Sequence, residues 1–291
     1  MRGLDKLKIP YRLNDFAYAQ KHPNELVGII GKTQVLNDHK IENPILLGAS
    51  IHSHPLEYPN LISENKNIHQ ILVPGVWMKK MFEEYYGNIV EAWPVGIDCE
   101  KWNPSIKKET QFDFLIYDKI RWERKSNEEQ LITPLKSQLK NNGLTYTEVT
   151  YNHYTHQELL DKVAISKGVI FLAKHETQGL AYQQILATGT PILAYDQQEF
   201  WLDPEFYPHR VKYGPVSSVP YWDDRCGIKF KSIGDFDDSL KQFLDKYTNR
   251  KFNPRAYITE NLTLEKCAKA YFSIYTNLEK KIEKLNISKL K

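Results

Sequence analysis

The sequence predicts an α/β protein whose parallel sheets carry helices on both faces. Short apolar runs between turn residues recur along the 291-residue chain, and stretches with helical spacing alternate with them. A strand buried on both faces reads as a nearly continuous apolar run, and its alternation with helices is typical of a parallel sheet. Residues 168–194 also contain a whole strand–turn–helix–strand unit.

The predicted elements follow in chain order. Residues 2–8 predict the end of a helix, and residues 10–13 predict the strand that follows it. Further apolar runs predict strands at residues 26–30, 45–49, 70–73, 89–93, 112–117, 169–173 and 192–195. Helical spacing predicts helices at residues 76–86, 128–140, 157–166 and 235–247. Because strands and helices alternate, we expect right-handed parallel crossovers.

The strand–turn–helix–strand unit predicts a site as well as a fold. The strand at residues 168–173 leads to a charged turn, His175-Glu176, and Gly179 then opens a stretch with helical spacing. Gly189-Thr190-Pro191 ends that helix, since glycine and proline are common just past a helix end. A helix N-terminus opened by a glycine lets a ligand approach the free backbone N–H groups and is suited to hold a phosphate.

The chain length favours one large or two modest domains. A polar, lysine-rich stretch at residues 98–111 contains Trp102-Asn103-Pro104 and predicts a hinge. We therefore place a first domain at residues 1–105 and a second at residues 106–262. Residues 263–291 are predicted to form a helix whose apolar positions share one face. This helix is long enough to cross back to the first domain.

Charge and composition exclude several classes of function. Lys and Arg number 39 against 36 acidic residues, and this net charge of +3 is too small to argue for a nucleic-acid partner. No apolar stretch is long enough for a transmembrane helix, and the first residues lack the apolar core of a signal peptide. The three cysteines are not in metal-ligand spacing, which predicts a cytoplasmic, disulfide-free protein.

The basic tail at residues 280–291 has two interpretations. Its composition is that of a solvated helix end, and the alternative is weak peripheral contact with an anionic membrane surface.

The central motif resembles a family signature. Glu176-x-x-Gly179-Leu180, then position 184, then Ala187-x-Gly189-x-Pro191 resembles the signature of retaining GT-B glycosyltransferases of the family-four (glycosyltransferase group 1) type. Weaker matches occur at residues 73–77, 93–98 and 264–275, so the resemblance covers roughly residues 45–280. It implies two Rossmann-like domains with a cleft between them. Against that pattern the N-terminal domain is shortened and lacks its first strand and glycine-rich turn.

The resemblance implies roles for the residues of the central motif. Glu176 would contact hydroxyls of the donor sugar and help stabilise charge at its anomeric carbon. Gly179, Leu180 and the following amides would hold the diphosphate. Position 184 is usually a glutamate that binds the ribose hydroxyls, and here it is Gln184, whose amide oxygen can still accept hydrogen bonds.

The family also implies a basic pair and a histidine. Lys119 and Arg124 have the spacing of the two cations that neutralise the leaving diphosphate, and Arg121 and Lys125 are rivals for that place. His52 matches the histidine that faces the donor sugar, with His54 as an alternate. We expect no metal and no cofactor, since His52 and His54 have no third ligand nearby in the sequence.

The predicted function is transfer of a sugar from a nucleoside diphosphate sugar to a glycan, lipid or small-molecule acceptor, with retention of configuration. The alternative is a non-catalytic GT-B relative that binds a nucleotide sugar or a partner enzyme, and a GT-B epimerase is a further rival. Residues 201–210 and 216–225 are rich in aromatic, acidic and serine side chains. They suit either sugar or base recognition or a rigid loop.

Overall fold

The computed structural model describes residues 1–289 and divides the chain into two compact units. Met1–Gly96 and Leu264–Lys291 form the first unit, and Ile97–Thr263 form the second. The division therefore falls before residue 105, because the segment after Gly96 is fixed to the second unit. Arg255 donates hydrogen bonds from Nη1 to the carbonyl oxygens of Cys99, at 3.2 Å, and Trp102, at 2.8 Å.

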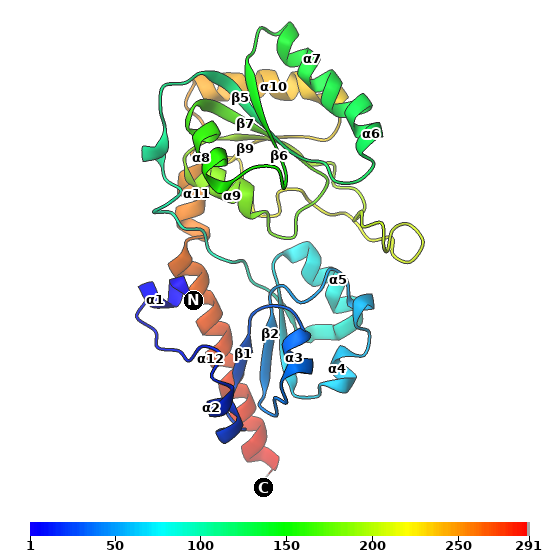
Figure 1. The fold of residues 1–291 in the computed structure, drawn as a ribbon, viewed down its shortest axis with the longest axis vertical. Helices are drawn as coiled ribbons and strands as arrows, with labels where there is room; N and C mark the ends of the chain where they lie inside the picture. The colour runs from blue at the N-terminus through cyan, green and yellow to red at the C-terminus, as the bar shows by residue number, and fades with distance from the viewer. Residues whose placement is uncertain (290–291) are drawn as a thin grey trace. The chain divides into compact units, whose positions relative to one another are not determined.

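The first unit contains a parallel sheet with the strand order β1-β2-β3-β4 (Figure 1). Leu47 of β2 lies in register with Ile29 on one side and Ile71 on the other, and Leu47 is fully buried. The strands are β1 (Val27–Ile29), β2 (Ile45–Gly48), β3 (Ile68–Val73) and β4 (Val90–Ala92). The helices that precede or join them are α1 (Arg2–Lys6), α2 (Phe16–Lys21), α3 (Gln34–Asp38), α4 (Leu61–Glu64) and α5 (Val76–Tyr86).

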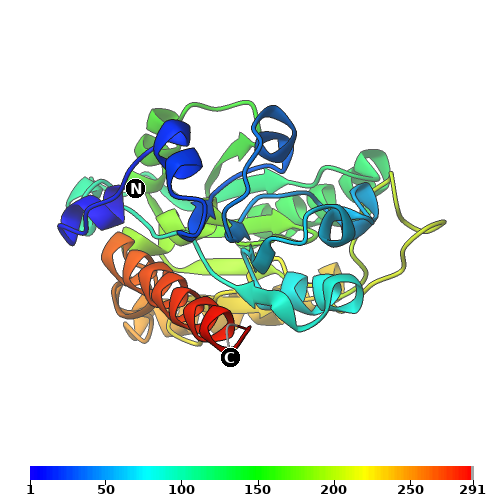
Figure 2. The same ribbon diagram turned by 90° about the horizontal axis from the view of Figure 1, so that it is seen from below.

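The long helix α12 (Leu264–Lys289) completes the first unit, as the sequence predicts. Its Tyr271, Leu278 and Ile282 belong to one buried cluster with residues of β2 and β3. A Cβ on Gly28 would lie 2.1 Å from the hydroxyl oxygen of Tyr271, so this close approach requires a glycine in β1. Seen from below, α12 is one unbroken helix (Figure 2).

The second unit contains a parallel sheet with the order β6-β5-β7-β8-β9. One face is covered by α7 and α10, whose leucine and phenylalanine side chains form a single buried cluster with the strands. The strands are β5 (Phe112–Lys119), β6 (Tyr146–Thr150), β7 (Ser166–Ala173), β8 (Ile192–Tyr195) and β9 (Gly227–Phe230). The helices are α6 (Arg124–Asn127), α7 (Thr133–Asn141), α8 (His156–Ala164), α9 (Leu180–Ala187), α10 (Ile233–Thr248) and α11 (Pro254–Asn261).

The prediction of a strand at residues 10–13 is wrong. Tyr11 and Leu13 are 40% and 63% exposed, so the segment has no buried face to pair with a sheet. Lys8 and Asn14, on either side, have positive φ angles of 55° and 54°, which turn the chain at both ends. These turns therefore prevent residues 10–13 from extending as a strand of the sheet.

The sequence analysis missed both edge strands of the second sheet. β6 reads Tyr-Thr-Glu-Val-Thr, and only its valine, Val149, is buried. β9 has four residues and includes a half-buried lysine, Lys229. A strand with an exposed face need not be apolar throughout, as in β6, and β9 is only four residues long with a lysine in its third position. A search for buried strands therefore overlooks them.

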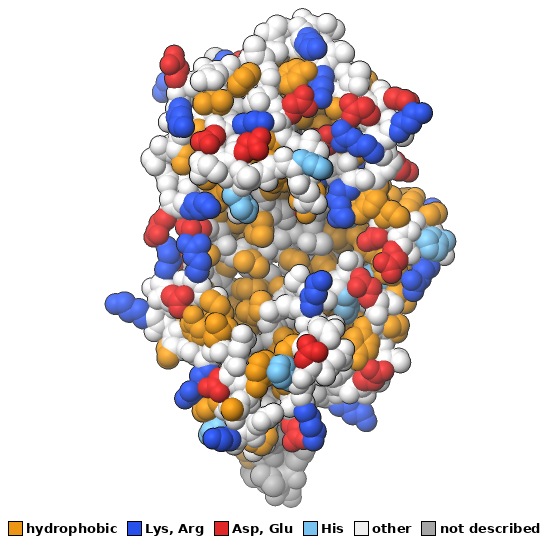
Figure 3. Space-filling view, viewed as in Figure 1, with side chains coloured by type: hydrophobic (Ala, Val, Ile, Leu, Met, Phe, Trp, Pro, Cys, Tyr) orange, Lys and Arg blue, Asp and Glu red, His pale blue; other side chains and the backbone are white. Residues whose placement is uncertain are grey.

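The surface in Figure 3 shows lysine and arginine side chains interspersed with aspartate and glutamate. Among residues 1–289 no helix is both long and apolar enough to cross a bilayer. Cys99, Cys226 and Cys267 are free thiols in the structure.

Candidate functional site

The second sheet has a topological switch point between β5 and β7. The chain leaves β5 for β6 on one side and then returns to β7 on the other side of β5. In open parallel sheets, ligands bind outside the carboxyl ends of the strands at such a point. Lys119 is the last residue of β5, and Glu176 lies in the loop that follows β7. Both predicted site residues therefore flank the switch point.

Lys119 and Glu176 form a buried ion pair. Nζ of Lys119 lies 2.6 Å from Oε1 of Glu176, and the two side chains are only 18% and 9% exposed. The same ammonium lies 4.4 Å from the ring centroid of Tyr151, in the loop after β6. A cation held between a carboxylate and an aromatic face is fixed in position, so little further ordering is needed when it meets an anion.

Burial raises the pKa of the Glu176 carboxyl above its ordinary value of 4.5, and the positive charge of Lys119 opposes that rise. Desolvation disfavours the charged carboxylate, whereas a neighbouring ammonium favours it. Arg121 acts on the pKa in the same direction as Lys119. At the switch point the pair thus places an amine able to bind an anion beside a carboxyl whose oxygens can accept hydrogen bonds from hydroxyls.

Gly179 begins α9 beside this pair. Its φ of +81° is in the left-handed region, and a Cβ there would lie 2.1 Å from Cε1 of Tyr182. The Tyr182 ring cannot move aside, because it is buried and its hydroxyl is hydrogen-bonded to both the amide and the carbonyl of Tyr221. No side chain caps the helix here, so its first N–H groups carry the partial positive charge that suits a phosphate.

Replacement of Gly179 by alanine tests this local constraint. We expect Gly179→Ala to lower the free energy of unfolding by about 3 kcal/mol, from left-handed backbone strain plus the overlap with Tyr182. Gly143→Ala is the matched control. Gly143 also has a positive φ, of +68°, but a Cβ added there would meet no atom within 4 Å. Urea unfolding should show a smaller loss of unfolding free energy for Gly143→Ala. Equal losses in the two variants would refute a contribution from the overlap with Tyr182.

Two adjacent glutamines of α9 lie in different environments. Gln183 is fully buried, and its amide donates to the carbonyl of Gln178 at 2.9 Å. Gln184 is half-buried, and its amide makes no hydrogen bond to any residue of the part that the structure describes. Gln183 is thus used by the fold, whereas the Gln184 amide remains available to a ligand.

The predicted cation Arg124 is already neutralised by carboxylates. Its Nη1 lies 2.6 Å from Oδ2 of Asp118, and its Nη2 lies 2.7 Å from Oε2 of Glu128. Arg121, by contrast, is exposed with its guanidinium 4.8 Å from the centroid of the Trp122 ring, and its charge acts on Glu176. The structure thus brings Lys119 to Glu176 and places Arg121, the rival of Arg124, within electrostatic reach. Lys125 is exposed on α6.

The loop that carries Glu176 is held by the segment between β8 and β9. The Glu176 amide donates to the carbonyl of Ser217 at 2.9 Å. Ser217 in turn donates from its hydroxyl to Asp196 at 3.0 Å, and Nζ of Lys229 lies 3.0 Å from the same carboxylate. These serine contacts support the rigid-loop interpretation of residues 216–225.

Asp196 is a residue that the sequence analysis missed. Its side chain has no exposed surface, and it also accepts a hydrogen bond from the Ser218 amide at 2.8 Å. The available signal was an acid directly after the buried strand β8, at the same edge of the sheet as Lys119 and Glu176.

His175, which precedes Glu176, is held in a neutral state. Burial lowers the pKa of its imidazole to about 4. Its ring stacks on Trp122 with centroids 5.1 Å apart, and its Nε2 accepts a hydrogen bond from the Leu202 amide at 3.2 Å. His175 therefore anchors residues 201–202 to the Glu176 loop.

His52 belongs to the first unit, in the loop after β2. Its Nε2 is 3.0 Å from the hydroxyl of Tyr86, its ring stacks on Phe82, and burial lowers the pKa of the imidazole to about 4. His54, the alternate, accepts a hydrogen bond at Nδ1 from the Leu56 amide and caps a short 3-10 helix. His54 thus stabilises the local fold as a helix cap, whereas His52 is a neutral, half-buried imidazole.

Within residues 1–289, no group of three or more His, Cys, Asp or Glu side chains is arranged to hold a metal ion. The chemistry visible at the switch point is that of fixed charges and a helix terminus.

Comparison with solved structures identifies the fold. No protein-family model matches the sequence, and no curated protein matches it. Sucrose-phosphate synthase from Thermosynechococcus elongatus matches with a TM-score of 0.57 and 12% identity, over 93% of this chain and 81% of the other. The chain has the GT-B fold.

Two further solved structures are similar. One is the α,α-trehalose-phosphate synthase (UDP-forming) from Burkholderia xenovorans in complex with glucose-6-phosphate. It has a TM-score of 0.60 and 8% identity, over 90% of this chain and 77% of the other. The other is a TarM variant from S. aureus in complex with fondaparinux, α-GlcNAc-glycerol and UDP. It has a TM-score of 0.54 and 13% identity, and this chain, 82% of which is covered, spans only 52% of the TarM chain.

Proposed function

We propose that this chain is a glycosyltransferase that moves a sugar from a nucleoside diphosphate sugar to an acceptor hydroxyl with retention of configuration. The observation that carries the proposal is the buried Lys119–Glu176 pair beside the uncapped N-terminus of α9. The ammonium and the helix N-terminus suit the two negative phosphates, and the carboxylate suits sugar hydroxyls. The GT-B fold of the similar synthases supports the same conclusion.

Each residue has a defined role in this reaction. Lys119 and the amides after Gly179 stabilise the leaving diphosphate, with a further positive charge from Arg121, since Asp118 and Glu128 already neutralise Arg124. Glu176 accepts hydrogen bonds from the sugar and stabilises positive charge at its anomeric carbon. His52 of the first unit acts toward the donor sugar, and Gln184 accepts from the ribose hydroxyls. Preorganised charges of this kind stabilise the charge that develops in the transition state.

The bond changes balance without a metal or cofactor. The bond between the anomeric carbon and the diphosphate oxygen breaks, and the acceptor oxygen bonds to that carbon from the same face. The proton of the acceptor hydroxyl passes to the leaving diphosphate, which acts as the base. The diphosphate oxygen keeps the electron pair of the broken bond, and Lys119 stabilises the negative charge that results.

A panel of nucleotide sugars tests the proposal. We expect the chain to release a nucleoside diphosphate from one UDP- or GDP-sugar, and UDP-sugars come first because two of the similar structures carry UDP in their descriptions. NMR of the product should show the anomeric configuration of the donor. Tight nucleotide binding without any release would instead indicate a binding module. Interconversion of the sugar without transfer would indicate an epimerase.

Gln184 gives a prediction for the nucleotide end of the site. We expect Gln184→Glu to strengthen binding of the nucleoside diphosphate about fivefold, because a charged acceptor makes a stronger hydrogen bond than an amide oxygen. We expect Gln184→Ala to weaken binding by a similar factor. Calorimetry with the 2′,3′-dideoxy nucleotide is the control. Both effects should disappear with that ligand, and an effect that persists would exclude a ribose contact.

A further inference from the structure

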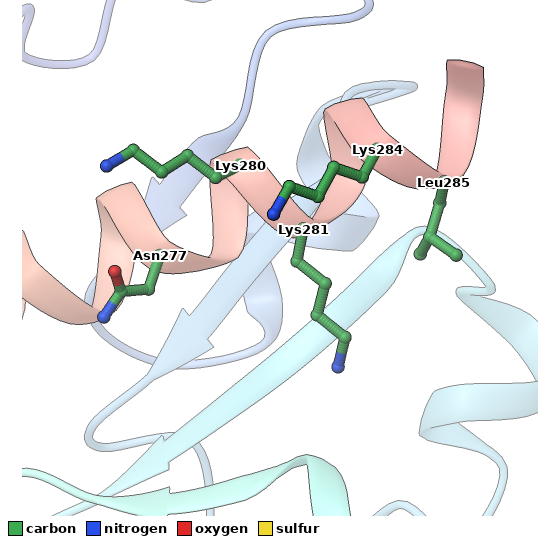
Figure 4. Close-up of a pocket in the computed structure, with 5 residues that line it drawn as sticks. All are labelled: Asn277, Lys280, Lys281, Lys284 and Leu285. Carbon is green, nitrogen blue, oxygen red and sulfur yellow. The ribbon is translucent and has the colours of Figure 1, made fainter. Parts of the chain in front are cut away.

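The last turns of α12 present a basic and apolar surface on the first unit. Asn277, Lys280, Lys281, Lys284 and Leu285 line a surface hollow of about 420 Å³. Figure 4 shows the three lysine side chains extended from the helix with Leu285 beside them. We call Lys280, Lys281, Lys284, Leu285 and Ile287 the basic face.

The lysines of the basic face are unpaired within the part of the chain that the structure describes. All three are exposed, and none makes an ion pair or a hydrogen bond to any residue between 1 and 289. Lys266 and Lys269, near the start of α12, are not part of this surface. A cluster of like charges on one helix is unfavourable by itself, so it is stabilised by an external anion.

Apolar side chains accompany these charges. Leu278 and Ile282 pack into the buried cluster of the first unit, but Leu285, next along the same stripe, is 47% exposed. Ile287 is 58% exposed. The helix therefore continues past the core that covers its apolar stripe, and Figure 1 shows its end extending beyond the strands.

The arrangement around the helix separates the charges by sign. At 3.6 residues per turn, the five residues of the basic face fall within an arc of about 160°. Glu279 and Glu283 fall outside that arc, on the side away from Leu285. Leu285 and Ile287 lie at the two ends of that arc, with the lysines between them. Leu285, which continues the apolar stripe and adjoins Lys281, is therefore the apolar side chain placed to enter a membrane interface.

We propose that the basic face of α12 binds the surface of an anionic lipid membrane. The lysines contact the lipid phosphates while Leu285, beside Lys281, enters the boundary between headgroups and acyl chains. Each lysine near an anionic surface strengthens binding about fivefold, so the three lysines together supply about 100-fold. Charge complementarity favours this partner, and the exposed Leu285 beside Lys281 distinguishes a membrane from a purely polar polyanion.

Vesicle sedimentation tests the proposal without any substrate, so its result is independent of glycosyl transfer. The probes are vesicles of phosphatidylglycerol and phosphatidylcholine in equal parts, and vesicles of phosphatidylcholine alone. We expect the full chain to sediment with the anionic vesicles at about 0.1 M salt and to be released at about 1 M, where the Debye length falls to about 3 Å. Binding to both vesicle types alike would overturn the electrostatic proposal.

Charge-matched variants locate the surface. The triple variant Lys280→Gln, Lys281→Gln, Lys284→Gln should lose about 100-fold in partitioning. The control Lys140→Gln, Lys231→Gln, Lys251→Gln removes the same charge from exposed lysines of the second unit and should bind like the unmodified chain. Leu285→Ser should weaken binding while keeping its salt dependence. Equal binding by both triple variants would overturn the proposal, as would retention on heparin with no vesicle binding.

Discussion

Glu176→Gln should reduce the rate of sugar transfer about 1,000-fold while leaving nucleotide binding intact. The amide keeps the size of the carboxylate but cannot stabilise positive charge at the anomeric carbon, and loss of one preorganised group typically has an effect of this size. The substitution also releases Lys119, whose Nζ lies 2.6 Å from the carboxylate in the ligand-free structure. Nucleoside diphosphate binding should therefore stay as tight or become tighter.

The measurement is kcat from released nucleoside diphosphate, together with its Kd from calorimetry. Glu205→Gln is the control, since Glu205 is an exposed acid of the same unit. A loss of affinity that matches the loss of rate would mean that Glu176 serves the fold of the site rather than the reaction. An unchanged kcat would remove Glu176 from the mechanism.

Lys119→Met should lose both donor binding and stability. The leaving diphosphate loses its nearest cation, so we expect kcat/KM to fall by about 100- to 1,000-fold. The substitution also leaves the Glu176 carboxyl buried without its ammonium partner, and breaking a buried pair in this way costs about 3 kcal/mol. Lys119→Arg keeps the charge and should recover part of both losses.

The stability loss in Lys119→Met should depend on pH. Burial already raises the pKa of Glu176, and removal of Lys119 takes away the main opposing cause, so the pKa rises further. A carboxyl whose folded pKa exceeds its unfolded value stabilises the folded state below the unfolded pKa and loses that contribution as pH rises through the folded pKa. The free energy of unfolding of the variant should therefore be closest to that of the unmodified chain near pH 4.5, and the difference between them should grow as pH rises.

Thermal unfolding across this pH range checks the expectation. Lys241→Met is the control, because Lys241 pairs with Asp237 at an exposed position where both side chains are more than 40% exposed. Exposed pairs contribute little, so this variant should show almost no loss at any pH. A pH-independent loss in Lys119→Met would indicate a packing defect rather than an unpaired carboxyl.

The sequence identified the central strands because buried parallel strands must be apolar throughout. Residues 169–173 and 192–195 were predicted as strands, and β7 and β8 contain them. Gly179 was predicted at the helix start, and the structure gives the reason in its positive φ and its contact with Tyr182. β6 was missed because a half-exposed strand need not be apolar, and β9 was missed because it is a four-residue strand that contains a lysine.

The site was predicted in part for a similar reason. Lys119 and Glu176 stand at the ends of neighbouring strands, so their meeting follows once the order of the strands is known. Arg124 was chosen by spacing along the chain, but spacing does not reveal that Asp118 and Glu128 bind its guanidinium. Asp196 escaped notice because its partners, Ser217 and Lys229, are distant in the sequence.

The alternation of strands and helices, the glycine that opens α9 and the charged residues near it could all be predicted from the order of the residues. Each of these depends on local periodicity, on backbone conformation or on residue type, and all three can be read along the chain. The folded chain was needed to show that Lys119 pairs with Glu176, that Arg124 is already neutralised, and that Gln184 rather than Gln183 keeps a free amide. Those outcomes depend on burial and on contacts between distant segments, because burial sets the strength of a charge pair and a competing partner removes a group from use.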